Sequence, residues 1–339
     1  MTPGLHLAVA LDGTGWDPST PDDGARFTPE HWVELVREAE RGLLDFVTFE
    51  DDLGHVGRLD AVLVASRVAP LTSRIGLVPT VVATHTEPFH LSKAIATLDY
   101  VSSGRAGVRV RASASPEAAR HFGRREITAD TPLGDLLDET ADYVEVLRRL
   151  WDSWEDDAEI RDVATGRFID RDKLHYIDFA GKWFSVKGPS ITPRPPQGQP
   201  PVAVLSHESP VHALARRSAD LVFTTPYGAE DVRTIGAEVG GVLNFVDVLV
   251  GFGRKNALES DAFAYTGSPA ELADLLVDWH AAGAAGFRLR PASLPDDLRV
   301  ITRKLVPLLR ERGVFRTEYT ATTLRGHLGL PRPANRYAA

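Results

Sequence analysis

Short apolar segments alternate with amphipathic segments along most of the 339-residue chain. The apolar segments are rich in β-branched residues, and the amphipathic segments repeat their apolar residues every three or four positions. This alternation is typical of βα units whose strands pair in a parallel sheet. The predicted strands cover residues 5–10, 46–49, 75–82, 106–111, 202–205, 221–224, 242–250 and 286–290. Eight strands close a (β/α)8 TIM barrel, which is the fold that we expect.

The segments between these strands carry helix signals. Pro29 directly after Thr28 predicts a helix that begins at the proline and has the threonine as its N-cap. Leu91, Ile95 and Leu98, spaced by four and three residues, predict a helix with one apolar face. Stripes of the same kind run through residues 137–151 and 298–308.

Two regions interrupt the alternation. Residues 152–201 form an insertion before the fifth strand, in which 173–178 and 182–186 predict a small hairpin joined through Ala180 and Gly181, followed by a proline-rich approach to the barrel. After the sixth strand, only residues 226–240 precede the seventh. We expect a single domain over residues 1–339, with the insertion and a C-terminal segment, 313–339, packed outside the barrel.

Composition narrows the choice of partners and of compartment. The net charge of −9 and the pI of about 5.7 argue against nucleic acid or an anionic membrane as the main partner. No apolar run approaches the roughly 18 residues that a membrane span needs. The first strand begins within five residues of the start, so we expect no signal peptide. The absence of cysteine excludes thiol catalysis and disulfides, and we expect a cytoplasmic protein.

Charged residues follow several predicted strands, at the end of a barrel where catalytic side chains collect. Glu50, Asp51 and Asp52 come after the second strand, and three adjacent carboxylates repel one another, so at least one should be paired or protonated in a dry site. Arg109 and Arg111 alternate along the fourth strand and therefore face the same side. If that side is the barrel interior, they need anionic partners, either a ligand or the acidic cluster.

Hydroxyl and imidazole side chains supply the other candidates. Thr80 ends the third strand, where a threonine also serves packing alone. His85 could exchange a proton near neutral pH, although most loop histidines do not, and the catalytic residue otherwise stays unassigned. Ser209 begins a helix whose first N–H groups, together with its hydroxyl, form an anion site. His207 and His212 do not share a helical face, so we expect no metal site.

A series of short segments links these candidates to a known family. In chain order they are EPF at 87–89, LDYVSSGR at 98–105, LWDSWEDD at 150–157, GP at 188–189, PQG at 196–198 and TLRGHLGL at 323–330. In this order they resemble the bacterial luciferase-like, flavin-dependent monooxygenases, specifically the branch with nitrilotriacetate and dibenzothiophene-sulfone monooxygenases. The resemblance runs from about residue 5 to 335.

The resemblance implies a TIM barrel that uses reduced FMN, supplied by a separate flavin reductase, to oxygenate a small organic substrate through a flavin C4a-(hydro)peroxide. By the same resemblance, Asp51 and Thr80 approach the flavin ring, and Arg109 stands beside it where the family usually carries an Asn. Ser209 matches a serine that holds the flavin phosphate. These four residues are the expected cofactor ligands.

The chain also departs from the family pattern. Leu133 and Leu137 stand where the resemblance places a His and a Tyr in contact with flavin, and aliphatic side chains donate no hydrogen bonds. His212 replaces a glycine of the phosphate turn, so that a Cβ obstructs the approach of a phosphate. The segment after Pro226 is shorter than the mobile insertion of the family. We therefore expect free FMN to bind in the micromolar range or more weakly.

Two classes of function remain open. The leading hypothesis is a flavin-dependent monooxygenase with a reductase partner, either as one chain or as a homodimer, and a variant of it uses a deazaflavin in place of FMN. The competing hypothesis is a barrel that has lost flavin and acts as a binding or accessory protein or catalyses a non-redox step. In the first case an anion should occupy the helix start after Ser209, and in the second His212 and its neighbours should fill that corner.

Overall fold

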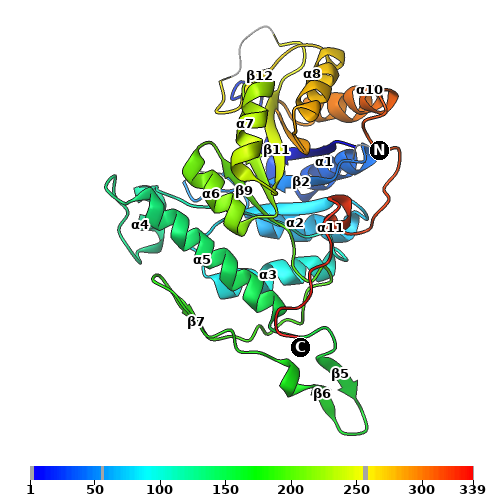
Figure 1. Ribbon diagram of the computed structural model, residues 1–339. Coiled ribbons are helices and arrows are strands. Elements are labelled where there is room, and N and C mark those ends of the chain that lie inside the picture. Colours follow the sequence, from blue (N-terminus) through cyan, green and yellow to red (C-terminus); the bar gives the residue numbers. More distant parts are fainter. Residues whose placement is uncertain (1–3, 55–56, 255–258, 339) are drawn as a thin grey trace.

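The computed structural model describes residues 4–54, 57–254 and 259–338 and contains a closed barrel of eight parallel strands (Figure 1). Each predicted strand is present within two residues of its expected bounds, which confirms the fold. A further short strand, β12 (Phe263–Tyr265), pairs with β11 beside the barrel. Around the ring, the order is β1 (His6–Leu11), β2 (Phe46–Phe49), β3 (Gly76–Val82), β4 (Val108–Arg111), β9 (Val202–Ser206), β10 (Leu221–Thr224), β11 (Leu243–Val250) and β13 (Gly286–Pro291), which pairs with β1 again.

Helices surround the barrel, and none in the described part of the chain is long and apolar enough to cross a membrane. The longer ones are α1 (Pro29–Arg41), α2 (Ala61–Val68), α3 (Pro88–Val101), α5 (Leu133–Asp152), α6 (Ser209–Ser218), α7 (Ala229–Val239) and α8 (Pro269–Ala281). The shorter ones are α4 (Pro116–Phe122), α9 (Asp296–Val300), a π-helical turn (Ile301–Leu305), α10 (Val306–Glu311), α11 (Leu324–His327) and 3-10 turns at Ala25–Phe27, Ala69–Leu71 and Arg171–Lys173.

Local sequence explains where α1 begins and which face it buries. The side chain of Thr28 accepts the backbone N–H of His31, so that Thr28 is the N-cap and Pro29 occupies the first turn, as predicted. Trp32, Leu35 and Val36 then follow at helical spacing and are all buried. The helix therefore packs against the barrel through this apolar face.

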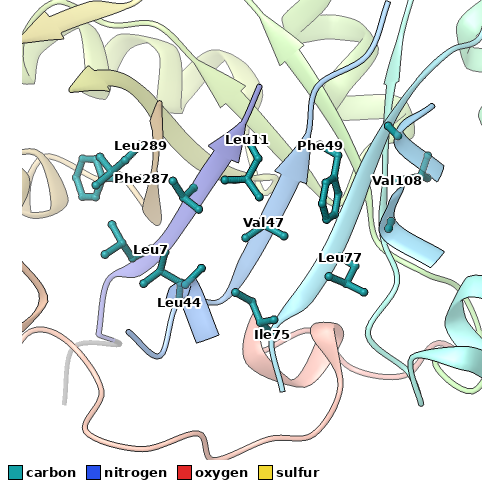
Figure 2. Packing of buried hydrophobic residues seen from close by; sticks show 14 of the residues in the cluster. Leu7, Leu11, Leu44, Val47, Phe49, Ile75, Leu77, Val108, Phe287 and Leu289 are labelled. Atoms are coloured by element: carbon teal, nitrogen blue, oxygen red, sulfur yellow. The ribbon is translucent and has the colours of Figure 1, made fainter. Parts of the chain in front are cut away.

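The main hydrophobic core lies between the strands and the helices. Figure 2 shows part of it, where Leu7 and Leu11 of β1, Val47 and Phe49 of β2, and Leu77 of β3 pack together. Neighbouring positions on the same strands face the other side, because side chains alternate along a strand. The inward-facing residues near the amino ends of the strands form a separate apolar cluster: Ala8, Phe46, Val78, Ala203, Leu221, Phe223 and Phe245.

The C-terminal segment closes the amino end of the barrel. Leu324 and Leu328 belong to the cluster inside the barrel, so the prediction that 313–339 packs outside is wrong for these two residues. Gly76 and Gly107 make room for this insertion, since a Cβ atom on either would lie 2.6 Å and 3.0 Å from a methyl carbon of Leu324. The barrel is therefore closed at the amino ends of its strands, and its open end lies at their carboxyl ends.

The part of the insertion at 152–201 that carries β5 (Glu159–Asp162) and β6 (Arg167–Ile169) projects from the body of the molecule (Figure 1). The expected hairpin is present, but its strands are shorter and shifted: β7 (Phe179–Ala180) pairs with β8 (Ser185–Val186), and residues 173–178 are not a strand. A second hairpin, β5 with β6, was not predicted. The turn of the β7–β8 hairpin contacts the first turn of α5, where Lys182 donates to Asp135 at 2.9 Å.

Candidate functional site

A cavity of about 510 Å³ opens at the carboxyl ends of the strands, where a barrel of this type carries its active site. Its lining divides into two chemically different sets. The apolar set comes mainly from β4, β9, α5 and α6: Val110, Ala112, Leu133, Leu137, Val204, Leu205, Val211 and Leu214. The polar set contains Asp12, Glu50, Asp52, Arg58, Arg109, Arg111, Thr140, His207, Asp261, Arg288 and Arg290, with Trp16 among them.

A buried network of charges forms the floor of this cavity. Arg288 of β13 donates to Asp247 of β11, with 2.6 Å between Nε and Oδ1, and to Glu50, with 3.0 Å between Nη1 and Oε1. Arg109 of β4 donates to the other carboxylate oxygen of Glu50. Burial opposes the ionisation of Glu50, but Arg109 and Arg288 outweigh it and lower the pKa of Glu50 to about 2. The floor therefore consists of charges that neutralise one another.

The two arginines of β4 lie as the alternation predicted. Arg109 and Arg111 both line the cavity, and Arg109 pairs with Glu50 while Arg111 donates to the backbone oxygen of Asp51 at 3.2 Å. The alternative of a structural ion pair is thus confirmed for Arg109. Its guanidinium also lies 3.4 Å from the hydroxyl of Thr80, which is buried beneath it and does not line the cavity.

In the acidic cluster Glu50, Asp51 and Asp52 after β2, ion pairs with arginines relieve the repulsion between the carboxylates, as expected. Glu50 pairs with two arginines, and Asp52 pairs with Arg58, which also bonds Asp12. Asp51 has no such pairing among the ion pairs of the described residues, and its carboxylate accepts the backbone N–H of Ala61 at 2.9 Å. Burial raises the pKa of Asp51 to about 6. Its side chain does not line the cavity, in contrast to Glu50 and Asp52.

The start of α6, near the cavity, forms a corner made by Ser209, His212 and Glu238. The hydroxyl of Ser209 donates to Glu238 of α7 at 2.9 Å, and Nδ1 of His212 lies 2.7 Å from the same carboxylate oxygen. These two contacts, with His212 the larger influence, hold the pKa of Glu238 below its usual value. A carboxylate of the chain itself thus occupies the position that we expected for an external anion or for His212.

The backbone N–H groups of α6 that follow Ser209 already have partners at the helix start or are missing. Pro210 has no N–H, and the N–H groups of Val211 and His212 both donate to the carbonyl oxygen of Glu208 at 3.0 Å. An ordinary helix start presents several N–H groups to an anion. The start of α6 therefore has fewer donors to offer.

His85 lies outside the cavity lining. Its ring stacks on Phe122 with 5.2 Å between centroids, and burial together with Arg125 lowers its pKa, so it is neutral at pH 7. Neither fact supports a role in proton transfer. Of the four expected cofactor ligands and His85, Arg109 lines the cavity, and Asp51, Thr80, His85 and Ser209 are not part of its lining.

Three residues of the site were missed by the sequence reasoning. Arg288 and Asp247 occupy inward-facing positions of β13 and β11, and the alternation that identified Arg109 would have identified them as well. Glu238 carries no such signal, because it is one of several acidic residues on an amphipathic helix. Its role depends on how α7 packs against α6.

Comparison with known proteins assigns the family. The model of the luciferase-like monooxygenases matches residues 9–240. The chain is 30% identical to N-acetyl-S-(2-succino)cysteine monooxygenase of Bacillus subtilis (strain 168), covering 98% of both chains, and 28% identical to component A of nitrilotriacetate monooxygenase of Aminobacter aminovorans, covering 91% of both. The barrel superposes on a long-chain alkane monooxygenase with a TM-score of 0.87 at 20% identity, covering 97% of this chain and 96% of that one.

A third relative differs from the first two in length. It is a component of pristinamycin IIA synthase from Streptomyces pristinaespiralis, 30% identical over 309 positions, covering 90% of this chain and 91% of the relative. The alignment with the Bacillus subtilis enzyme extends over 438 positions, 99 more than the whole of this 339-residue chain. The family match, the relatives and the barrel agree: the chain belongs to the luciferase-like monooxygenases, the flavin-dependent enzymes that oxygenate small organic substrates.

Proposed function

We propose that the protein is the oxygenase of a two-component system, in which a separate flavin reductase supplies reduced FMN in the cytoplasm and a small organic substrate is oxygenated in the cavity at the barrel mouth. The observation that carries this proposal is the two-sided lining of that cavity. The apolar set around Leu133 and Leu137 excludes water from a reacting centre, and the polar set of the same lining orients polar groups. The name of the relative "component A" supports a reductase partner.

The residues present fit one part of FMN better than the other. A flat ring with one polar edge suits the cavity, whose lining is apolar in one set of residues and rich in N–H donors in the other. A phosphate dianion does not suit the corner of Ser209, His212 and Glu238, because a carboxylate already takes the hydroxyl and imidazole donors there. When bound, reduced flavin supplies the reaction with oxygen, and the protein supplies a dry cavity and fixed charges.

The test is substrate-dependent oxygen consumption by the purified protein with a flavin reductase and reduced FMN. Leu133→Trp enlarges a side chain that lines the cavity and is 41% exposed, so it fills the cavity without disturbing the core. We expect this variant to lose about tenfold or more of the substrate-dependent rate, because the substrate no longer reaches its position. The matched control is Leu63→Trp on α2, which is 69% exposed and lies outside the cavity lining.

Equal rates for wild type, Leu133→Trp and Leu63→Trp would place the reaction elsewhere. Flavin turnover without any substrate-dependent product would refute the oxygenase assignment. A reduced deazaflavin, offered in place of reduced FMN in the same assay, tests the variant of the proposal that uses that cofactor.

A second candidate is favoured by the length of the chain. The protein matches the pristinamycin IIA synthase component almost without gaps, and it lacks residues that the longer relatives carry. In this form of the proposal, the chain is the shorter of two different polypeptides in one monooxygenase, and the longer polypeptide is another member of the same family. Light scattering separates a monomer or homodimer from a mixed complex. Product formation that requires a longer family member from the same organism would decide for the second candidate.

A further inference from the structure

We propose that Glu238 is a built-in anion of the corner at the start of α6, so that this chain holds flavin without using its phosphate and does not distinguish FMN from riboflavin; this inference rests on the proposed function. Glu238 reaches the corner from α7, a different helix from Ser209 and His212, and one of its oxygens accepts both of their side chains. A phosphate that approached the corner would meet a carboxylate already in place.

The corner has the features of an anion site whose anion is part of the chain. His212 is 6% exposed at its side chain, and its Nε2 atom has no hydrogen-bond partner within the described residues. Its Nδ1 atom is directed to Glu238, and the hydroxyl of Ser209 is directed to the same oxygen. Arg216, one turn further along α6, donates to the backbone oxygen of Glu238 at 3.4 Å. Donors thus converge on Glu238 from three positions of α6.

Displacement of Glu238 would bring the phosphate little net gain. The hydrogen bonds that the Ser209 hydroxyl and the His212 Nδ1 atom could donate to a phosphate are ones that they must first withdraw from Glu238. The displaced carboxylate would remain close to the phosphate, on the same short stretch of α7, and like charges repel. The backbone adds few donors, because Pro210 has no N–H and the next two N–H groups bond to Glu208.

The experiment compares oxidised FMN with riboflavin by quenching of flavin fluorescence on the full chain. For wild type we expect the two dissociation constants to agree within about threefold. Glu238→Ala clears the carboxylate and frees Ser209 and His212, so we expect its affinity for FMN to rise by about tenfold or more, the effect of one charge-assisted hydrogen bond, with riboflavin unchanged. Glu230→Ala is the matched control, since Glu230 lies on the same helix, is 83% exposed and pairs with Arg233.

A second variant identifies the donors. Glu238→Ala combined with Ser209→Ala should lose most of the gain for FMN, because the hydroxyl that would bind the phosphate is then absent. Inorganic phosphate should compete with FMN in Glu238→Ala and should not compete with riboflavin. Thermal unfolding with and without phosphate provides a reading that needs no flavin, since a ligand of the native state raises the melting temperature.

Two results would overturn the inference: wild type that binds FMN at least tenfold more tightly than riboflavin, or Glu238→Ala that gains neither FMN affinity nor stabilisation by phosphate. Failure of the proposed function has a different signature. If neither flavin binds wild type and no oxygenation is found, the oxygenase assignment is refuted, while the phosphate response of Glu238→Ala still decides whether Glu238 blocks the corner.

Discussion

The floor of the barrel and the corner at the start of α6 both set a carboxylate of the chain against groups that could otherwise hold a ligand. On the floor, Glu50 pairs with Arg109 and Arg288, whose side chains are 4% and 1% exposed. In the corner, Glu238 bonds Ser209 and His212, but its own side chain is 41% exposed. The two regions share a chemistry and differ in their access to water.

This difference determines what each region can do. A buried charge that loses its partner cannot be solvated, so the floor is fixed in place and its arginines are not free to take an anion. An exposed carboxylate that is removed leaves donors that water can satisfy at little cost. The floor therefore serves as structure, whereas the corner is a site that a single substitution can open. Three further measurements test this contrast.

The largest effect is expected at the floor. Glu50→Ala removes the shared partner of Arg109 and Arg288 and leaves a buried guanidinium uncompensated, which should lower the free energy of unfolding by about 3–5 kcal/mol. Urea unfolding followed by circular dichroism measures it, with Glu230→Ala as the surface control at roughly 0.5 kcal/mol or less. A loss below about 1 kcal/mol for Glu50→Ala would mean that water reaches the floor.

An intermediate effect is expected at Asp51, which lies beside the floor but is half-buried. Its pKa is raised from 3.8 to about 6, so between these values the native state keeps a proton that the unfolded state has released. This group therefore makes stability fall as the pH rises from about 4 to 6. Asp51→Asn, which can still accept the N–H of Ala61, should flatten that part of the pH profile, by about 1 kcal/mol or less because the group is partly solvated.

The melting temperatures of wild type and Asp51→Asn across this pH range would show the difference directly. Identical slopes for the two proteins would show that Asp51 titrates normally. In that case the repulsion within the acidic cluster would be relieved by the arginines alone, through Arg58 and the floor.

The smallest effect on stability is expected in the corner. Glu238→Ala should leave the urea midpoint unchanged within the error of the measurement, because its carboxylate is exposed and its two partners become accessible to water. A midpoint that falls as far as that of Glu50→Ala would remove the contrast between the two regions, and would make Glu238 a structural group instead of a replaceable anion.

Sequence reasoning succeeded where local pattern determines structure. The eight strands, the N-cap at Thr28 and the inward direction of Arg109 and Arg111 all follow from spacing and alternation along one segment. It failed where the structure depends on how two segments distant in the sequence pack against each other. The pairing of Arg288 with Asp247, and the reach of Glu238 across to α6, depend on strand register and helix packing that one segment does not encode.

The insertion and the C-terminal segment show the same limit. Residues 173–178 have a strand-like composition, but the paired strand begins only at Phe179, because the N–H groups of Ile177 and Asp178 both donate to the single carbonyl oxygen of Lys187. Leu324 and Leu328 are four residues apart, as on one face of a short helix, but the place of Leu324 inside the barrel is visible only once Gly76 and Gly107 are seen to leave space for it.

The position of Leu324 has a consequence for biosynthesis. During translation the strands emerge in order, and the barrel ring can close once β13, which ends at Pro291, has left the ribosome. The amino end of the barrel, with Phe46, Phe223 and Phe245, stays uncovered until Leu324 and Leu328 emerge more than 30 residues later. Until then the nascent barrel displays an aromatic surface of the kind that chaperones bind and that promotes aggregation. A fusion partner or a premature stop near residue 324 would therefore harm recovery of the folded protein well before it affected the cavity at the opposite end.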